Sequence, residues 1–436
     1  MSVISPADQE QLVAQFVGML NSLSHSLEAS EETEKSLAEK MQKLTGEVYR
    51  CWAKNAKPAE KPSCCPQCGQ TLRHRGRVRL QVQTRLGVVC FLIPRYRCER
   101  CQQDYYPDGE QLRFGSHGVS VPLARLICRL MAWMPGEQVQ KFLLEDFGVR
   151  LSKERIQAIT ATAGEKLLEE EDRRSEQFQQ QHSGPCPQPL PRGEKRWEVA
   201  AVYADGTMIH AEGQWREIRV GQVCLGGEGG WEKRRSFARF QDVDTFGRQL
   251  VQVAYEAGYG EAEQKVFLGD GARWLWELAE LHFPDAIQVL DWYHLSQKVH
   301  EAAREAFGEG NPEGHAWAKA RLEELHAGRW REALRAVEEL RKRLRGKRKR
   351  EALRRLAVYI RHNSGRIDYP RYRAMGLPVG SGAVEGTCKH LVGARCKGSG
   401  MRNWRKRRAE AVLSLRAALL DGTFDHLWTT CIRQAA

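Results

Sequence analysis

The sequence lacks any run of about 18 apolar residues, the length that a helix needs to cross a bilayer. Its first residues, MSVISPADQE, also lack the basic and then apolar order of a secretory signal. We therefore expect neither an integral membrane protein nor a secreted one, but a cytoplasmic chain. In that reducing compartment the 13 cysteines do not fit a disulfide framework, so paired cysteines indicate metal binding and isolated ones indicate core packing.

Acidic residues are too few to balance the basic ones. The 55 Asp and Glu residues face 68 Lys and Arg residues, which gives a net charge of +13 and a pI near 9.2. This excess favours a polyanionic partner, and nucleic acid is the first candidate. The alternative is a solvated basic surface without a partner, and the position of the charge along the chain decides between them.

Two Cys-x-x-Cys pairs, in CCPQCGQTL and YRCERCQQDYYP, flank about thirty residues of strand-like alternation. Four thiolates at this spacing can close a tetrahedron around one structural Zn²⁺. The predicted ligands are Cys65, Cys68, Cys98 and Cys101, and the adjacent Cys64 is an alternative to Cys65. The competing interpretation is four free or redox-active thiols.

Helical periodicity predicts two helices between Gln9 and Trp52 and three more between residues 120 and 170. The last of the three follows Ser152, a good N-cap, and exposes Lys153 and Arg155 on its first turn. This order fits a helix-turn-helix that contacts DNA, and the alternative is a generic packing of three small helices. Residues 169–196 lose the apolar periodicity and gain Gln, Pro and Gly, which predicts a linker.

The second half of the chain predicts the order strand, strand, strand, helix, strand, helix, strand. The first strand, in WEVAAVYADGT, ends at Asp205, and two later strands end at Asp270 and Asp291. Asp244 is expected to cap the first helix. Acidic residues at the C-terminal ends of neighbouring strands converge, and their repulsion is relieved by a hard cation such as Mg²⁺ or Mn²⁺.

A further carboxylate, Glu385, lies in the opening of a helix within LPVGSGAVEGTCKHL. Small residues precede it and allow a close backbone approach to the same edge of the sheet. The residue pattern alone ranks Asp270 and Asp291 equally. For His294, in DWYH, a core histidine bonded to backbone competes with a role near a scissile phosphate.

The segments YADGT, GDGA, DWYH and GSGAVEGTCKHLVGARCKGSGMRNW together resemble the Kra-type insertion-sequence transposases over roughly residues 195–425. These are bacterial DDE transposases with a ribonuclease-H-like core, distantly similar to the Mutator and hAT groups. The resemblance implies that Asp205, Asp270 and Glu385 are catalytic and hold two Mg²⁺ (or Mn²⁺) ions, with Asp291 and His294 supporting the active edge. It also implies metal-dependent hydrolysis at transposon ends and joining of the 3′-hydroxyl ends to target DNA.

The expected partners are double-stranded DNA, both transposon ends and target, and further copies of the chain. A homodimer or larger homo-oligomer is expected because two ends must be held together, and the expected location is the nucleoid of a bacterial cytoplasm. Two alternatives remain: a non-catalytic zinc-containing DNA-binding regulator, and another ribonuclease-H-like nuclease such as a junction resolvase.

About ninety residues between Asp291 and Glu385 are rich in Glu, Ala, Leu and Arg and predict a helical insertion. Its run RKRLRGKRKREALRR holds ten basic residues in fifteen, and a second basic group follows Glu385. Both are expected to contact the DNA backbone, although such a run is often only a solvated helix face. The predicted contacts are Arg341, Lys342, Arg343, Arg345, Lys347, Arg348, Lys349, Arg350, Arg395, Lys397, Arg402, Arg405, Lys406, Arg407 and Arg408.

The predicted fold class is a mixed, multidomain α/β chain. A ribonuclease-H-like mixed sheet with a helical insertion follows N-terminal helices, a zinc ribbon and a helix-turn-helix-like helical domain. The expected boundaries are 1–57 for the N-terminal helices, 58–115 for the zinc ribbon, 116–170 for the helix-turn-helix, 171–196 for the linker, 197–296 and 376–436 for the two parts of the catalytic core, and 297–375 for the insertion.

Overall fold

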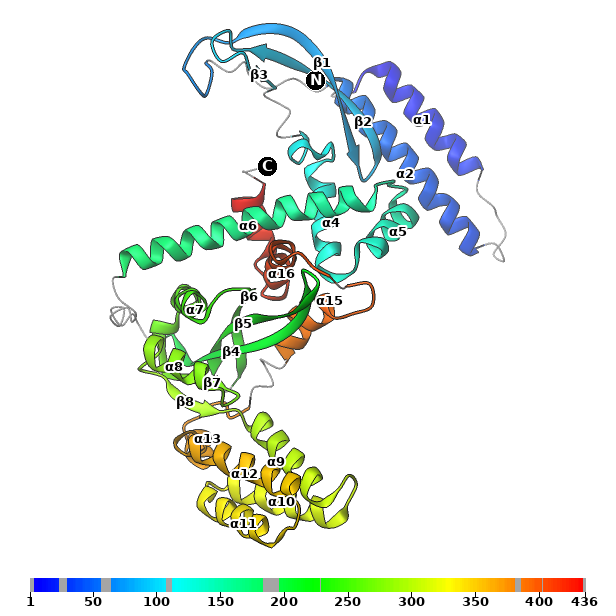
Figure 1. The fold of residues 1–436 in the computed structure, drawn as a ribbon. Helices are drawn as coiled ribbons and strands as arrows, with labels where there is room; N and C mark the ends of the chain where they lie inside the picture. Colours follow the sequence, from blue (N-terminus) through cyan, green and yellow to red (C-terminus); the bar gives the residue numbers. More distant parts are fainter. Residues whose placement is uncertain are drawn as a thin grey trace. The chain divides into compact units, whose positions relative to one another are not determined.

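The computed structural model describes residues 4–22, 30–55, 64–106, 112–182, 196–227, 229–380, 386–401 and 403–433. The chain divides into two compact units, one formed by Met1–Lys166 with Asp425–Ala436 and the other by Leu167–Phe424. Both contain helices and a sheet, so the chain is mixed α/β (Figure 1). No helix in the described ranges is long and apolar enough to cross a membrane.

The first unit begins with the two predicted helices, α1 (Pro6–Asn21) and α2 (Ser30–Asn55), followed by the predicted hairpin. Strands β1 (Arg73–Thr84), β2 (Gly87–Arg97) and β3 (Asp104–Tyr105) form an antiparallel sheet. Alternate residues of β2, among them Val89, Phe91 and Ile93, are buried together with Ala53 of α2. The period of two along β2 therefore gives the hairpin one face that packs on α2.

Three helices complete the first unit as the periodicity predicts: α4 (Val121–Trp133), α5 (Gly136–Phe147) and the first part of α6 (Lys153–Gln181), preceded by η2 (Gly115–His117). The hydroxyl of Ser120 caps α4. The chain returns to this unit at its end through α17 (Phe424–Leu427) and η6 (Trp428–Ile432). There the ring of Trp428 stacks on Phe114, with centroids 5.6 Å apart.

The linker expected from residue 169 begins later than the sequence indicated, because α6 continues to Gln181. Two kinds of contact stabilise this polar part of the helix. Arg173 bonds Glu170 one turn away, and the ring of Phe178 packs 5.8 Å from that of Tyr255 in the second unit. The remainder of the expected linker, residues 183–195, lies outside the described residues.

The sheet of the second unit has the strand order β6-β5-β4-β7-β8. Strands β4 (Trp197–Ala211), β5 (Gln214–Gly227) and β6 (Gly230–Arg239) are antiparallel neighbours, whereas β7 (Ala262–Gly269) and β8 (Ile287–Leu290) run parallel to β4. The helices α7 (Val243–Ala257), with η3 (Tyr259–Glu261), and α8 (Arg273–His282) connect β6 to β7 and β7 to β8. The predicted order of strands and helices is confirmed.

Helices cover both faces of this sheet. Phe237 of β6 packs on Phe246 of α7, with ring centroids 5.2 Å apart, while the next residue, Ala238, is buried against α16 (Lys406–Leu420) and η5 (Cys388–Gly393). The short α15 (Ala394–Cys396) follows η5. Burial on both faces explains the almost unbroken apolar run in β4.

The N-cap of α7 differs from the prediction. Its side-chain cap is Asp242, whose carboxylate accepts a hydrogen bond from the Thr245 N–H at 2.9 Å. Asp244 lies inside the first turn instead and bonds Arg248 at 2.9 Å. Both residues are aspartates, so only the position at which the backbone becomes helical selects the cap.

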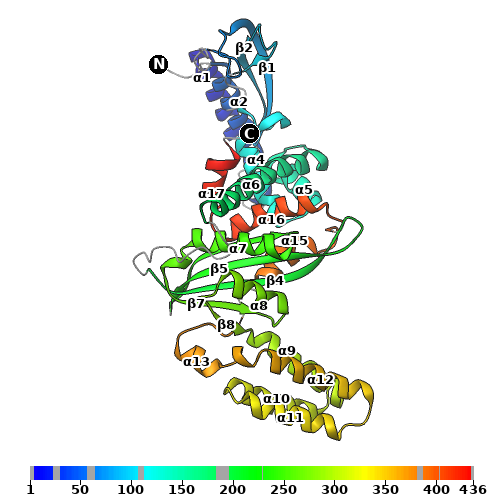
Figure 2. The same cartoon turned by 60° about the vertical axis from the view of Figure 1, so that its left-hand side comes forward.

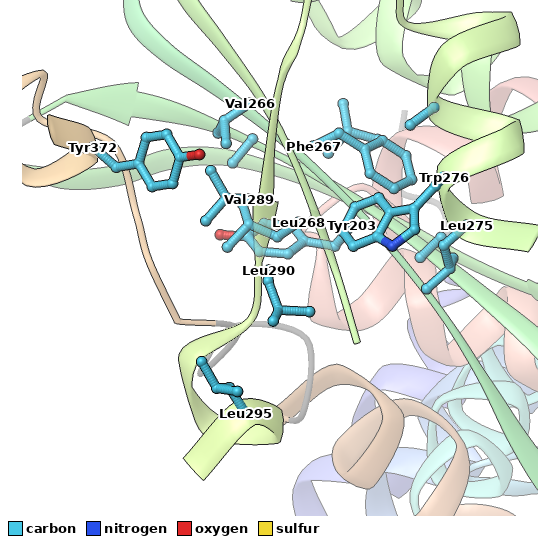
Figure 3. Close-up of a cluster of buried hydrophobic side chains, with 14 of the residues drawn as sticks. Tyr203, Val266, Phe267, Leu268, Leu275, Trp276, Val289, Leu290, Leu295 and Tyr372 are labelled. Atoms are coloured by element: carbon cyan, nitrogen blue, oxygen red, sulfur yellow. The ribbon is translucent and has the colours of Figure 1, made fainter. Parts of the chain in front are cut away.

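Helices follow β8, as the periodicity of the insertion predicts. They are α9 (Trp292–Phe307), α10 (Pro312–His326), α11 (Trp330–Arg343), α12 (Lys347–His362), η4 (Ser364–Arg366) and α13 (Tyr369–Ala374), which gather beyond the β8 side of the sheet (Figures 1 and 2). Their core continues that of the sheet. Figure 3 shows Leu268 of β7 and Val289 of β8 in one buried cluster with Trp276 of α8, Leu295 of α9 and Tyr372 of α13.

Candidate functional site

Asp205 and Asp270 lie at the same level on neighbouring parallel strands. The last pair of residues that β4 and β7 share is Tyr203 and Leu268, and each aspartate follows two positions later. Neighbouring strands are about 4.8 Å apart, so the two carboxylates face one edge of the sheet. β4 itself does not end at Asp205 as predicted but continues to Ala211, because the antiparallel pairing with β5 goes on after β7 has ended.

Asp291 extends this line by one strand. The pairing of β7 with β8 ends at Gly269 and Leu290, which brings Asp291 to the level of Asp270. We call Asp205, Asp270 and Asp291 the aspartate row. It crosses β4, β7 and β8 where the parallel part of the sheet ends, the place at which open α/β sheets bind ligands.

The carboxylate of Asp205 is partly buried and close to other charges. Burial raises its pKa, and the neighbouring Asp270 carboxylate raises it further. The Cys388 thiol donates to Oδ2 of Asp205 at 3.2 Å and the Gly206 N–H donates to Oδ1 at 2.7 Å, which partly offset that rise. Neither Asp205 nor Asp270 forms a salt bridge with another described residue, so their negative charges are not neutralised by a protein cation at contact distance.

A residue of the helical insertion bonds the loop that carries Asp270. Its carboxylate accepts a hydrogen bond from the Ala272 N–H at 2.8 Å, across Gly271, whose φ is +94°. The hydroxyl of Tyr359 on α12 donates to the backbone oxygen of Asp270 at 2.5 Å. A Cβ at Gly271 would lie 2.6 Å from the Tyr359 ring, so the glycine is needed both for its φ and for this approach.

A second tyrosine holds the next strand end in the same way. The buried hydroxyl of Tyr369, at the start of α13, donates to the backbone oxygen of Leu290 at 3.1 Å. Leu290 directly precedes Asp291. Two hydroxyl groups of the insertion therefore bond the main chain at the ends of β7 and β8, next to two members of the aspartate row.

Asp291 is 1% exposed and caps α9. Its carboxylate accepts hydrogen bonds from the N–H groups of Tyr293 at 3.1 Å and His294 at 3.4 Å, and from Nδ1 of the His294 ring. The bond to Asp291 raises the pKa of His294, burial lowers it, and the carboxylates of Asp270 and Asp205 raise it further. The imidazole of His294 is thus a basic group in direct contact with the aspartate row.

Glu385 lies outside the described residues, as does Arg402. The chain after Glu385 is bonded to the sheet beside Asp205. Thr387 accepts a hydrogen bond from the Gln222 side chain of β5 at 2.5 Å, and Cys388 donates to Asp205. Within the described ranges, the aspartate row and its neighbours do not form a group of three ligand atoms within 4.8 Å of one another.

The four predicted zinc ligands do form such a group. Cys65, Cys68, Cys98 and Cys101 place their Sγ atoms within 4.8 Å of one another, with 3.9 Å between Cys65 and Cys101 and 3.5 Å between Cys68 and Cys98. Four sulfurs at about 2.3 Å from a tetrahedral Zn²⁺ are about 3.8 Å apart, so the cluster fits this ion. Cys64 is exposed and is not a member.

The surroundings of Cys65 lower the pKa of its thiol. Burial raises its pKa, but hydrogen bonds from the Tyr105 hydroxyl and from the N–H groups of Gln67 and Cys68 outweigh burial and bring the pKa to about 6. The Tyr105 oxygen lies 3.1 Å from Cys65 Sγ. Because thiolates rather than thiols bind zinc, this environment favours the ligand form.

The predicted DNA contacts on the insertion are at the surface. Seven of them are exposed: Lys342, Arg343, Arg345, Lys347, Arg348, Lys349 and Arg350. Arg341 is half-buried, and its Nε lies 2.7 Å from Oε2 of Glu338. Of the second group, Lys397, Arg405, Arg407 and Arg408 are exposed and Lys406 is half-buried.

Arg395 does not belong with them, because its side chain is 2% exposed. The guanidinium lies 4.8 Å from the centre of the Trp404 ring, and burial lowers its pKa to about 10. Lys397, two residues later, is exposed, whereas Arg395 and Cys396 of the short helix α15 are both buried. The prediction that Arg395 contacts DNA at the protein surface is therefore wrong, because the side chain is buried.

The two predicted contacts on α6 already have partners within the first unit. Lys153 forms a salt bridge with Glu137, and Arg155 donates two hydrogen bonds to the backbone oxygen of His117, at 2.6 and 2.9 Å. To bind a phosphate, Lys153 would have to leave or share Glu137, whereas Arg155 has further N–H groups beside the two that bond His117.

Sequence reasoning missed Cys388, Tyr359 and Tyr369 as neighbours of the aspartate row. Cys388 lies within a segment that the resemblance already singled out, so its position in GTCKHL was a usable signal. The tyrosines carry no such signal, because they lie in helical patterns 68 and 78 residues after Asp291 and only the packing of the insertion brings them to the sheet.

Comparisons with known proteins give one family and a distant structural neighbour. No curated protein sequence matches this chain. Among solved structures, a chain described as "Drosophila P element transposase strand transfer complex" is 10% identical, with 72% of this chain and 83% of that chain covered and a TM-score of 0.26. Residues 212–428, just under half of the chain, match the model of an uncharacterised protein family, UPF0236; the match includes Asp270, Asp291 and both basic groups.

Proposed function

We propose that this chain is a DDE-type DNA transposase of the Kra kind, with a ribonuclease-H-like core. The observation that carries the proposal is the aspartate row, in which Asp205 and Asp270 share one level on adjacent parallel strands without a salt-bridge partner among the described residues. Asp205, Asp270 and Glu385 are the proposed ligands of Mg²⁺ or Mn²⁺. Neighbouring carboxylates that repel each other form a donor set that a hard divalent cation would satisfy.

Bound at these residues, such ions would supply stabilisation of phosphoryl charge and a nucleophile at neutral pH. The protein's own part is to position the ligands. Cys388 and Gly206 orient the two oxygens of Asp205, while Tyr359 holds the main chain at Asp270. Asp291 is committed to His294 and to the start of α9, which favours a supporting role for both residues.

Two helix starts support the proposed DNA contact. α12 begins with Lys347–Arg350 and α16 with Lys406, Arg407 and Arg408, and neither has an acidic residue in its first turn. Positive charge at a helix N-terminus opposes the helix dipole and costs roughly 0.3–1 kcal/mol per residue. Two helices of this chain begin with such destabilising positive charge. This is expected if these helix starts form a basic surface that binds phosphates.

The remaining assignments complete the proposal. The zinc ribbon at 58–115 and the helices at 116–170 would recognise the transposon ends, and the parts 197–296, 297–375 and 376–436 would form the catalytic core with its insertion. The reaction is strand hydrolysis at an element end, followed by attack of the 3′-hydroxyl on target DNA, by a homodimer or larger assembly.

The test is cleavage of element-end DNA in Mg²⁺ by the wild type and by Asp205→Asn. We expect the variant to lose at least about 100-fold in rate because a charged ligand is replaced by a neutral one, with DNA binding unchanged. The control is Asp244→Asn, an exposed aspartate in the same unit, which should cleave normally. Equal cleavage by Asp205→Asn would reject the site, and tight binding without cleavage by the wild type would favour a non-catalytic regulator.

A further inference from the structure

A groove opens between α9 and the start of α10, on the surface of the helical insertion. Its volume is about 410 Å³, within the roughly 300–1,000 Å³ of typical ligand sites. Three glycines contribute to its lining, and so do Tyr293, Gln297, His300, Arg304 and His315. Among these described lining residues there is no aspartate or glutamate. The lining therefore offers hydrogen-bond donors and an aromatic ring, and the carboxylate of Glu301 lies beside it, bonded to Gln297 at 3.0 Å.

Four of the lining residues of α9 form one stripe on the solvent side of the helix, whereas Ala303, which also lines the groove, is buried. Tyr293, Gln297, His300 and Arg304 follow at intervals of four, three and four residues, which places them on a single face. The opposite face is the one that packs, since Leu295, Val299, Ala302 and Ala306 are buried. The stripe is not needed for the core, so its composition requires another explanation.

The basic groups of the groove have no partners among the described residues. Arg304 forms no salt bridge with any of them, although its helix carries Glu301 and Glu305, which pair with Lys298 and with Arg355 instead. His300 and His315 likewise have no hydrogen bond from their side chains to another described residue, and both are exposed. Three donors that converge on one groove without internal acceptors are complementary to an anion.

The aromatic end of the groove adjoins the aspartate row. Asp291 caps α9, His294 bonds Asp291, and Tyr293 between them is 50% exposed. From Tyr293 the stripe leads along α9 to Arg304 over roughly 16 Å, at about 1.5 Å per residue. A strand leaving the aspartate row would meet first a ring and then the three donors.

We propose that this groove binds a few unpaired nucleotides of the DNA strand next to the scissile phosphate. The ring of Tyr293 stacks on a base, and His300, Arg304 and His315 bond phosphate oxygens. Stacking on an aromatic ring accepts any base, which suits a strand whose sequence changes with the insertion site. The identification of the strand rests on the proposed function, whereas the chemistry of the groove does not.

The experiment measures binding of the full chain to a single-stranded DNA of about 12 nucleotides containing 2-aminopurine, without added Mg²⁺ or Mn²⁺ so that no cleavage occurs, and without a chelator so that any bound zinc is kept. We expect the 2-aminopurine fluorescence to be quenched when the DNA binds to the wild type, because the base stacks on Tyr293. Tyr293→Ala should lose the quenching and weaken binding about 5- to 100-fold, the range of one base–aromatic stack, while Tyr293→Phe should keep both. Arg304→Ala should weaken binding and reduce the salt dependence by about one phosphate contact.

Lys298→Ala is the matched control, because Lys298 is an exposed cation of the same helix that is outside the groove and pairs with Glu301. Wild-type affinity in Tyr293→Ala and Arg304→Ala would overturn the proposal. Equal affinity for RNA of the same sequence, or displacement of the DNA by millimolar inorganic phosphate, would overturn the assignment to a DNA strand. Loss of Mg²⁺-dependent cleavage with this binding intact would instead contradict the proposed function alone.

Discussion

At the scale of single residues, the second unit contains a carboxyl group whose ionisation opposes folding. Asp421 follows α16 and accepts hydrogen bonds from the N–H and hydroxyl of Ser236, at 2.6 and 3.1 Å. Burial raises its pKa from 3.8 to about 7, although Ser236 and the nearby Arg235 and Arg234 act in the opposite direction. The folded state therefore keeps a proton that the unfolded chain has already lost.

This gives a pH dependence of stability with a defined sign. A carboxyl whose folded pKa is raised contributes stability that is fully present below its unfolded pKa, near 3.8, and is lost as the pH rises through about 7. We expect Asp421→Asn to remove this loss. Relative to the variant, the wild type should lose on the order of 4 kcal/mol between pH 4 and pH 8, measured by urea denaturation. Asp244→Asn, at an exposed position, should follow the wild type, and parallel curves for Asp421→Asn and the wild type would contradict the expectation.

At the scale of elements, the insertion is bonded to the strand ends through Tyr359 and Tyr369. A hydroxyl that bonds a main-chain oxygen beside a proposed ligand acts on the position of that ligand, not on the substrate. The helices of the insertion therefore have a structural link to the aspartate row, in addition to their exposed basic residues.

Tyr359→Phe tests this link. Removing the hydroxyl leaves the ring over Gly271 but releases the Asp270 backbone, and we expect about a tenfold fall in the cleavage rate, partly recovered at higher Mg²⁺, with unchanged DNA affinity. The matched control is Tyr372→Phe, whose hydroxyl bonds Gly365 within the insertion at 3.4 Å. A rate for Tyr359→Phe equal to that of the control at all Mg²⁺ concentrations would argue against a positioning role.

The hairpin of the first unit supports a second prediction at this scale. We expect the wild type to hold one Zn²⁺ per chain and Cys98→Ser to lose it, with faster proteolysis of residues 58–115, because structural zinc supplies folding free energy. Zinc content by atomic emission is the measurement. Cys64→Ser should retain the metal, since Cys64 is exposed beside the buried Cys65. Loss of zinc from Cys64→Ser alone would exchange the two ligand assignments.

At the scale of the whole molecule, the net charge of +13 matters only where it is exposed. We expect replacement of Lys347, Arg348, Lys349 and Arg350 by alanine to weaken DNA binding and to reduce the slope of log K against log salt by up to about 3.6, at about 0.9 for each phosphate that the variant no longer neutralises. Fluorescence anisotropy between 50 and 200 mM salt, about the range over which such slopes are measured, gives the value. An unchanged slope would remove this helix start from the DNA path.

Arg395 provides the internal comparison. Because it is buried against Trp404, Arg395→Ala should lower stability and leave the salt slope unchanged. Arg395 and the basic residues at the start of α12, all predicted as DNA contacts, would then differ in what they do for the molecule.

The sequence by itself determined the order of elements, the cysteine quartet and the acidic residues after β7 and β8. These features are local: alternation with a period of two or 3.6, Cys-x-x-Cys spacing, and a polar residue at the end of an apolar run each depend on a few neighbouring residues. Only the tertiary structure decided that β4 continues past Asp205, that Arg395 is buried and that Tyr359 and Tyr369 reach the strand ends. Burial and contact at those positions depend on partners far away in the chain, and no local pattern encodes them.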